Sequence, residues 1–155
     1  MPEKFVDTRH SRSDEQREVM RQIVEAGHCP FCPPNLKLWH NRPILREGEF
    51  WILTPSRWPY PHTALHLLAI AKTHVEKLSE LPPEAGQDLF ELFQWAEKEF
   101  DLPGGALAMG AIALRFGDTD YTGATVKHLH AQLIIPDIHA PDYEKLRLPI
   151  GRSSK

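Results

Sequence analysis

The sequence predicts an α+β domain built on an antiparallel sheet, with an N-terminal helix and one long helix. Short apolar segments separated by turn residues indicate small strands, and two amphipathic runs have the periodicity of helices. A length of 155 residues suits a single compact domain. The composition, 41% hydrophobic and 25% charged, is that of a folded protein, and the 14 prolines exclude long uninterrupted helices from much of the chain.

The N-terminal part is predicted to hold the first helix. Residues 1–11 are polar and lack periodicity, so we expect a flexible N-terminus followed by one domain over residues 12–155. A capping pattern at Ser13-Asp14-Glu15-Gln16 opens an amphipathic run that ends near Gly27. The proline-rich stretch 28–34 then predicts a turn.

The middle of the chain is predicted to form the first strands of the sheet. Residues 36–40, 44–47 and 50–53 have the pattern of small antiparallel strands, and residues 65–71 that of an apolar strand. Three prolines within residues 54–62 exclude regular structure there and predict an aromatic loop.

The second half is predicted to contain the long helix and two further strands. Prolines and an acidic residue open an amphipathic run from about Pro83 to Phe100. Residues 105–115 and 126–135 are predicted as strands, with a loop over 116–123 between them. The tail after Asp137 is expected to be loop or docking structure.

Charge and hydropathy limit the partners of the protein. With 18 Lys and Arg against 21 Asp and Glu, the formal net charge of -3 lacks the basic excess of a non-specific nucleic-acid binder, whereas a nucleotide-sized ligand fits. No apolar run reaches the roughly 18 residues of a membrane span, and the polar start has no signal-peptide core. We therefore expect a cytoplasmic protein with no membrane or nucleic-acid partner.

The segment from His128 to Ile135 carries the polar residues best suited to chemistry. Alternate side chains of a strand share a face, so His128, His130 and Gln132 are predicted to point one way and the apolar residues between them the other. Three polar side chains along one face of an apolar strand are costly without partners. The alternation therefore favours a functional site over two satisfied histidines.

This segment resembles the signature of the histidine triad (HIT) superfamily, His-φ-His-φ-His with φ apolar. Gln132 stands where the third histidine would be, as in the nucleotidyltransferase branch with galactose-1-phosphate uridylyltransferases and dinucleoside polyphosphate phosphorylases. The segment from Leu67 to His74 and the loop Gly123-Ala-Thr-Val-Lys-His128 resemble further parts of the family. The resemblance implies a HIT-like fold and a homodimer joined through the helix and sheet.

Two departures bear on the substrate. At Ile52-Leu53-Thr54-Pro55 the sequence lacks the carboxylate that holds ribose in HIT hydrolases, and Gly117 stands where the family has an asparagine. The loop Ser56-Arg57-Trp58-Pro59-Tyr60 instead resembles the Asn-x-φ-Pro-φ loop of the transferase branch, with Ser56 in place of Asn.

The resemblance implies nucleotidyl transfer or phosphorolysis at the α-phosphate of a nucleotide, nucleotide sugar or dinucleoside polyphosphate. His130 would be the nucleophile, forming a nucleotidyl-histidine, and the amide of Gln132 would donate to a phosphate oxygen. Alternatives are a HIT-type hydrolase that uses water and a non-catalytic nucleotide-binding protein of the same fold. The residues expected to bind substrate are Thr125, Gly123, Lys127 or Arg115, Arg57 and Trp58.

The two cysteines stand together as Cys29-Pro-Phe-Cys32, too few for a disulfide framework. A lone CxxC fits a redox pair, a metal half-site or two quiet thiols, and the prolines that follow disfavour thioredoxin-like chemistry. The resemblance implies a structural zinc ion held by Cys29, Cys32, His74 and His128. We expect His28, His40 and His62 to be poorer substitutes as ligands, and His66 to pack within its strand.

Overall fold

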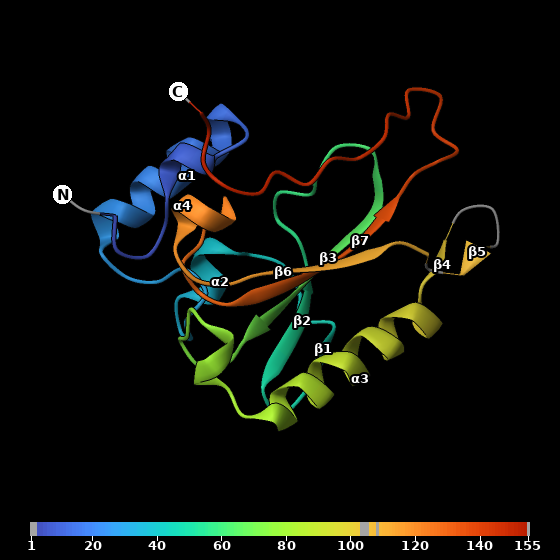
Figure 1. The fold of residues 1–155 in the computed structure, drawn as a ribbon, viewed down its shortest axis with the longest axis horizontal. Coiled ribbons are helices and arrows are strands. Elements are labelled where there is room, and N and C mark those ends of the chain that lie inside the picture. The colour runs from blue at the N-terminus through green and yellow to red at the C-terminus, as the bar shows by residue number, and fades with distance from the viewer. Residues whose placement is uncertain (1–2, 103–105, 108, 155) are drawn as a thin grey trace.

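The computed structural model describes residues 3–102, 106–107 and 109–154 (Figure 1). Its centre is a five-stranded antiparallel sheet in the order β1-β2-β3-β7-β6. These strands are β1 (Arg46–Glu47), β2 (Trp51–Pro55), β3 (Thr63–Ala71), β6 (Ala111–Arg115) and β7 (His130–Pro136). A separate pair is formed by β4 (Asp101–Leu102) and β5 (Ala106–Leu107). The predicted α+β class with an antiparallel sheet is confirmed.

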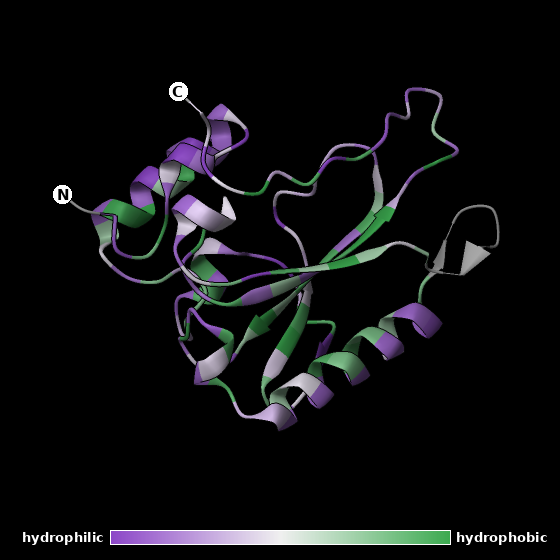
Figure 2. Ribbon diagram, viewed as in Figure 1, coloured by the Kyte–Doolittle hydropathy of each residue, from purple (hydrophilic) through white to green (hydrophobic). Residues whose placement is uncertain are grey.

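Two helices cover opposite faces of the sheet. Helix α3 (Pro83–Glu99) packs through Leu92, Phe93 and Ala96 on one face. Helix α1 (Asp14–Ala26) packs through Met20 and Ile23 on the other. Figure 2 shows hydrophobic residues along the central strands and mostly hydrophilic residues in α1. Because side chains alternate along a strand, two cores form from neighbouring residues of the same strands.

The ends of both helices follow from their sequences. The Ser13 hydroxyl accepts a 3.0 Å hydrogen bond from the Gln16 amide and caps α1, and Gly27 ends it at φ 72°, a left-handed conformation that glycine adopts without strain. Proline at the first position of α3 needs no hydrogen-bond partner for its nitrogen. The predicted N-terminal helix and long helix are confirmed within one residue at each end.

Two predicted segments differ from the structure. Residues 36–40 form the short helix α2 (Leu36–Trp39) and not a strand, because the Cys32 carbonyl accepts from the amides of Asn35 and Leu36 and turns the chain helically. The predicted loop 116–123 contains the short helix α4 (Thr119–Thr122), which Asp118 caps. The other short helices are η1 (Thr8–His10) and η2 (Leu78–Glu80).

The two late strands begin further along the chain than predicted. Strand β6 starts at Ala111, while Gly105 and Ala108 of the predicted strand lie outside the described residues. Strand β7 starts at His130, because Val126 pairs with Val6 of the N-terminal segment in an isolated bridge and not with a strand of the sheet. His128 therefore precedes the strand on which the sequence placed it.

Residues 3–11, which the sequence predicts as a flexible N-terminus, pack against the domain in the structure. Val6 is buried and pairs with Val126, and the Asp7 amide donates to the Thr125 carbonyl at 2.7 Å. Burial opposes ionisation of Asp7, but hydrogen bonds from Arg9 and Thr119 hold the pKa of this carboxyl well below its usual range. A short apolar pair, Phe5-Val6, anchors this otherwise polar segment.

The tail after β7 has no helix or strand over residues 137–154 and runs back toward α1 and α4 (Figure 1). Near its end the Arg152 amide donates to the Asp120 carbonyl at 2.9 Å, so the tail is attached to α4. Among the residues that the structure describes, no helix is both long enough and apolar enough to cross a membrane.

Candidate active site and metal centre

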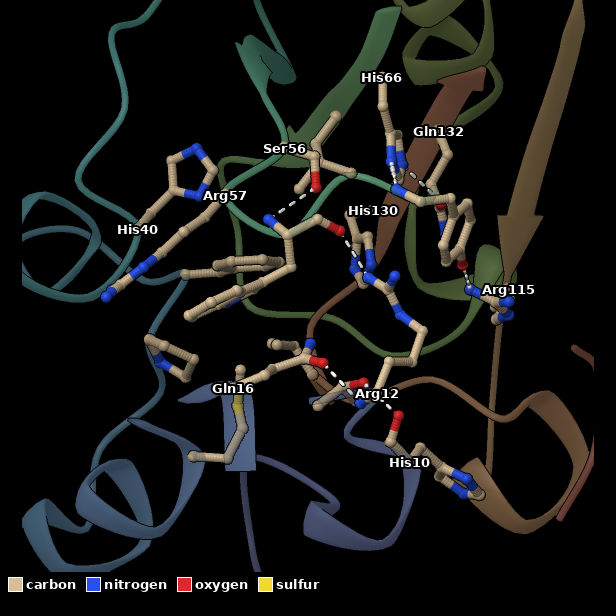
Figure 3. Close-up of a pocket in the computed structure, with 18 of the residues that line it drawn as sticks. His10, Arg12, Gln16, His40, Ser56, Arg57, His66, Arg115, His130 and Gln132 are labelled. Atoms are coloured by element: carbon tan, nitrogen blue, oxygen red, sulfur yellow. Dashed lines mark hydrogen bonds between the residues drawn. The ribbon is translucent and has the colours of Figure 1, made fainter. Parts of the chain in front are cut away.

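A pocket opens on the face of the sheet that α1 covers (Figure 3). His66 of β3 and His130 and Gln132 of β7 line its floor. Its walls come from α1, the cysteine turn, the loop after β2 and the segment before β7. Four stretches that are far apart in the sequence thus meet at one cavity.

His130 is held as a neutral imidazole in one tautomer. Its Nδ1 lies 2.7 Å from the His128 carbonyl oxygen, which can only accept, so Nδ1 carries the proton and the Nε2 lone pair is free. Burial lowers the pKa of His130 to about 4, with Arg115, His66 and His40 contributing in the same direction. The imidazole is therefore uncharged at neutral pH.

Gln132 is oriented by a short chain of hydrogen bonds. The Tyr60 amide donates to His66 Nδ1 at 3.1 Å, which places the His66 proton on Nε2. That Nε2–H donates to Gln132 Oε1 at 2.8 Å. The amide oxygen is thus engaged, and the amide nitrogen of Gln132 is left as a donor for a ligand. His66 does pack within its strand as expected, but sequence reasoning missed this orienting contact.

An apolar and aromatic group forms one part of the pocket. Phe31, which lies between the two cysteines of the turn, meets His130 edge-on with ring centroids 5.2 Å apart. Trp39 and Trp58 pack against the core beside it, together with Met20, Ile23 and Leu68. This part of the pocket offers flat apolar surfaces to a ring.

A cationic group forms another part. The guanidinium of Arg12 lies 4.3 Å from the centre of the Tyr60 ring, and Arg115 Nη1 donates to the Tyr60 hydroxyl at 3.1 Å. Arg57 also lines the pocket, donates to the Trp39 carbonyl and stacks on Trp58 at 4.9 Å. Arg57 and Trp58, two of the predicted substrate residues, both line this pocket.

Of the remaining predicted substrate residues, two line the pocket and one does not. Thr125 and Gly123 line the pocket. The Gly123 amide, however, donates to the Thr119 carbonyl at 2.9 Å as the cap of α4, so this predicted phosphate donor is already used. Lys127 is not among the lining residues; its Nζ donates to the Glu3 carbonyl at 2.6 Å, because the pairing of Val6 with Val126 turns it toward the N-terminal segment.

The four predicted metal ligands converge behind His130. Cys29, Cys32, His74 and His128 each present one ligand atom, and these atoms lie within 4.8 Å of one another. His128 Nδ1 is 3.4 Å from Cys29 Sγ, 3.6 Å from Cys32 Sγ and 3.2 Å from His74 Nδ1. A tetrahedral zinc ion with ordinary bond lengths would separate its ligand atoms by about 3.3 to 3.8 Å. The donor set and its spacing therefore fit zinc.

Neighbouring groups prepare this cluster for a cation. His128 Nε2 donates to the Ala71 carbonyl at 2.6 Å, which leaves the Nδ1 lone pair facing the cysteines. Two imidazole nitrogens at 3.2 Å, with lone pairs directed together, need a cation or a proton between them. Burial raises the pKa of Cys29 to about 12, a shift that a bound cation would reverse.

Sequence reasoning also missed the part that Arg12 plays. It precedes the cap of α1, and nothing local marks it, because its place beside Tyr60 depends on how residues 3–11 pack. For His66 a signal existed. It shares its face of β3 with Leu68 and Ile70, so the alternation directs it to the same side as Gln132.

Comparisons with known proteins address the fold. No family model matches the chain, and no curated protein sequence matches it significantly. Among solved structures, a hypothetical protein from Leishmania major is similar with a TM-score of 0.50 at 20% identity, over 70% of this chain and 76% of that chain. This likeness shows a shared fold.

Two other solved structures are similar at lower TM-scores. A zinc-bound histidine triad family protein from Mycobacterium smegmatis has a TM-score of 0.45 at 21% identity, over 73% of this chain and 76% of that chain. A hypothetical histidine triad nucleotide-binding protein from Sulfolobus tokodaii strain7 has a TM-score of 0.49 at 23% identity, over 82% of each chain.

Proposed function

We propose that the protein is a nucleotide-processing enzyme of the histidine triad superfamily, which transfers or hydrolyses a nucleotidyl group through His130. The observation that carries this proposal is the arrangement of His130, whose proton is held on Nδ1 by the His128 carbonyl while Nε2 remains free beside Gln132. The resemblance of the segment from His128 to Gln132 to the nucleotidyltransferase branch supports it.

The reaction proceeds in two displacements. Nε2 of His130 attacks the α-phosphorus, an N–P bond forms, and the P–O bond to the leaving group breaks with the electron pair departing on oxygen. An acceptor, water or phosphate, then attacks the same phosphorus and breaks the N–P bond, which returns the neutral imidazole. Where water is the acceptor, its proton leaves to solvent.

Gln132 limits the leaving group. Its amide nitrogen can donate a hydrogen bond to a phosphate oxygen, but an amide cannot deliver a proton as an imidazolium does. Groups that are stable as anions, such as phosphate, diphosphate or a sugar phosphate, therefore leave readily, and amines do not. This supports dinucleoside polyphosphates and nucleotide sugars as the substrate class.

The aromatic part of the pocket is suited to the nucleoside. Trp39, Trp58 and Phe31 offer faces on which a base stacks, a contact that tolerates any base. The pocket-lining residues that the structure describes include no Asp or Glu. This agrees with the sequence, which lacks the carboxylate that holds ribose in HIT hydrolases. A ribose in this pocket would therefore be bound by groups other than a carboxylate.

The metal centre would stabilise the positions of the residues around His130. Zinc, when bound by Cys29, Cys32, His74 and His128, supplies a cross-link between the N-terminal turn and the segment before β7. The turn itself holds Phe31 against His130, and the His128 carbonyl holds the His130 proton. Structural zinc at these residues is part of the proposal.

Trapping of the covalent intermediate tests this function. Purified protein is incubated with dinucleoside polyphosphates and nucleotide sugars, quenched, and examined by mass spectrometry of peptides. We expect a nucleotide attached to His130 in the wild type and none in His130→Ala, whose zinc content and thermal stability stay unchanged. Turnover without an adduct, or undiminished turnover by His130→Ala, would show that the mechanism is wrong.

The same preparation separates the two enzymatic alternatives and the non-catalytic one. Adding inorganic phosphate to the adduct before the quench tests phosphorolysis, and dilution of the unquenched adduct into buffer alone tests hydrolysis. A protein that binds nucleotide but forms no adduct and turns over neither substrate class is a non-catalytic binder. The homodimer and the cytoplasmic location remain predictions of the resemblance and of the composition.

A further inference from the structure

The pocket around His130 is too narrow to hold a nucleotide in the conformation that the structure shows. Its volume is about 90 Å³. Pockets that bind a small organic molecule have volumes of roughly 300 Å³ or more. Some part of the pocket wall must therefore move before a ligand of that size can reach His130.

A second cavity adjoins the pocket along the C-terminal tail. It has a volume of about 450 Å³ and lies between residues 60–62 of the loop after β2 and residues 144–149 of the tail. Three residues, Arg12, Tyr60 and Pro149, line both cavities. They therefore form the partition between the two cavities, and moving one of them aside would join the cavities into a space of the size that a nucleotide needs.

Two of the three residues in the partition are fixed. Tyr60 is buried, its amide donates to His66 Nδ1 at 3.1 Å, and its hydroxyl accepts from Arg115 Nη1 at 3.1 Å. Arg115 Nη2 also donates to the Pro149 carbonyl at 2.8 Å. Opening the partition at Tyr60 or Pro149 would therefore break hydrogen bonds that hold the sheet, the loop and the tail together.

The Arg12 side chain can move alone. Its backbone amide donates to Gln16 Oε1 at 2.8 Å, so the main chain is held at the start of α1. Its guanidinium extends to the loop after β2, where it donates to the Trp58 carbonyl at 2.5 Å and lies 4.3 Å from the centre of the Tyr60 ring (Figure 3). Rotation about the side-chain bonds breaks these two contacts and leaves the backbone in place.

Opposing interactions act on Arg12 in this position. The hydrogen bond to a carbonyl and the contact with an aromatic ring favour it. Partial burial, however, lowers the pKa of Arg12, and the positive charge of Arg115 lowers it further. The free energy that holds the side chain in place is therefore smaller than the two favourable contacts alone would give, which favours exchange between two positions.

We propose that the Arg12 side chain is a gate, which closes the pocket by reaching the Trp58 carbonyl and opens it by turning away from Tyr60. Opening joins the pocket to the cavity along the tail and gives a ligand access to His130. In the open position the guanidinium stays at the rim of the pocket, beside a bound ligand, because the Arg12 backbone is fixed. The gate goes beyond the proposed function, since it controls access to His130 whatever group that residue acts on.

Chemical labelling of His130 tests the gate without a nucleotide. The probe is diethyl pyrocarbonate, an acylating reagent that attaches to imidazole nitrogens and is too large for the closed pocket. Purified protein is labelled at pH 7, and the rate at His130 is measured by mass spectrometry of peptides. We expect Arg12→Gln to raise this rate at least about tenfold, because a state that is open for roughly a tenth of the time or less reacts in proportion to its population.

Two controls accompany this variant. Arg17→Gln removes the same charge from an exposed residue of α1 that pairs with Asp14, and it should label at the wild-type rate. His139, an exposed histidine of the tail, should label at the same rate in all three proteins. An unchanged rate at His130 in Arg12→Gln, or an equal rise in Arg17→Gln, overturns the gate.

The wild type gives a second measurement that needs no variant. With the gate closed for most of the time, its His130 should label at least about tenfold more slowly than its His139. Equal rates at the two histidines overturn the gate even if Arg12→Gln folds poorly.

The outcome is separable from that of the proposed function. A nucleotide trapped on His130, together with labelling that does not respond to Arg12→Gln, overturns the gate and leaves the covalent mechanism. Faster labelling in Arg12→Gln without any trapped nucleotide overturns the covalent mechanism and leaves the gate.

Discussion

At the scale of single residues, the chemistry of the pocket depends on which atoms carry protons. A backbone carbonyl holds the His130 proton on Nδ1, and a backbone amide holds the His66 proton on Nε2. Each constraint comes from a main-chain group, which does not titrate. The free lone pair of His130 and the free amide nitrogen of Gln132 are therefore fixed over the physiological pH range.

Replacing Gln132 with histidine should widen the range of leaving groups. A histidine here restores a titratable donor, so cleavage of an adenosine phosphoramidate should rise at least about tenfold relative to cleavage of a dinucleoside polyphosphate. The measurement is the ratio of the two rates in wild type and Gln132→His, with water and with phosphate as acceptor. If the wild type cleaves the phosphoramidate as readily as the polyphosphate, Gln132 does not discriminate between leaving groups.

His66 should make stability depend on pH. Burial lowers its pKa to about 4, with Arg12 and Arg115 adding to the effect, whereas in the unfolded chain it titrates near its ordinary value of about 6.5. Between these values the unfolded state binds more protons, so the free energy of unfolding falls as pH falls from about 6.5 to 4, by up to about 3 kcal/mol.

Urea unfolding at pH 7 and pH 5 measures this loss. His66→Gln should lose less stability between the two pH values than the wild type, because its side chain takes up no proton. His139→Gln, at an exposed position, is the control and should keep the wild-type difference. Equal losses in all three proteins would assign the pH dependence to other groups.

At the scale of elements, the cysteine turn connects the four candidate metal ligands to strand β7. The Cys32 carbonyl accepts hydrogen bonds from the amides at the start of α2, and the Phe31 ring contacts His130. The two thiols lie beside His128, just before β7 begins. A metal ion bound at the turn would hold the chain in this conformation. Its binding free energy would therefore add to the folding free energy that maintains all of these contacts.

Purified protein should contain about one zinc ion per chain, since two thiolates and two imidazoles complete a tetrahedron. Cys32→Ser should lose the metal and lower the free energy of unfolding by several kcal/mol. His28→Gln is the control. His28 neighbours the turn, but its Nε2 accepts a hydrogen bond from Trp39 Nε1, so we expect this variant to keep the zinc ion. Metal analysis of reduced, untagged wild type that finds no zinc would remove the site.

At the scale of the whole molecule, the pocket is closed by segments from both ends of the chain. The N-terminal segment pairs with the segment before β7 and places Arg12 in the lining of the pocket. The tail places Pro149 there. A Cβ on Gly123 would lie 3.0 Å from the Gly151 carbonyl oxygen and 3.3 Å from that of Pro149, so the tail passes close over this turn.

Breaking the N-terminal contact should therefore damage both stability and the pocket. Val6→Asp places an unpaired charge at a buried position and should cost about 3 kcal/mol or more of unfolding free energy. It should also weaken nucleotide binding, because residues 3–11 hold Arg12 in the lining of the pocket. Lys4→Asp, two residues earlier and on the same segment, is the control. Wild-type stability in Val6→Asp would show that residues 3–11 do not stabilise the domain.

The sequence alone was sufficient for the features that local patterns encode. Ser13, Gly27 and Pro83 mark helix ends by their own backbone chemistry, and alternation along β7 separates His130 and Gln132 from the apolar residues Leu129, Ala131 and Leu133. The four candidate metal ligands were named from a resemblance, and the structure brings them together. These features depend on residues close in sequence or on a motif of fixed spacing.

Only the tertiary structure decided the features that depend on distant segments. The packing of residues 3–11, the direction of Lys127 and the meeting of Arg12 with Arg115 all follow from contacts between segments more than a hundred residues apart. Local propensity cannot express these, because a side chain's partners are set by which elements pack together and not by its neighbours in the chain.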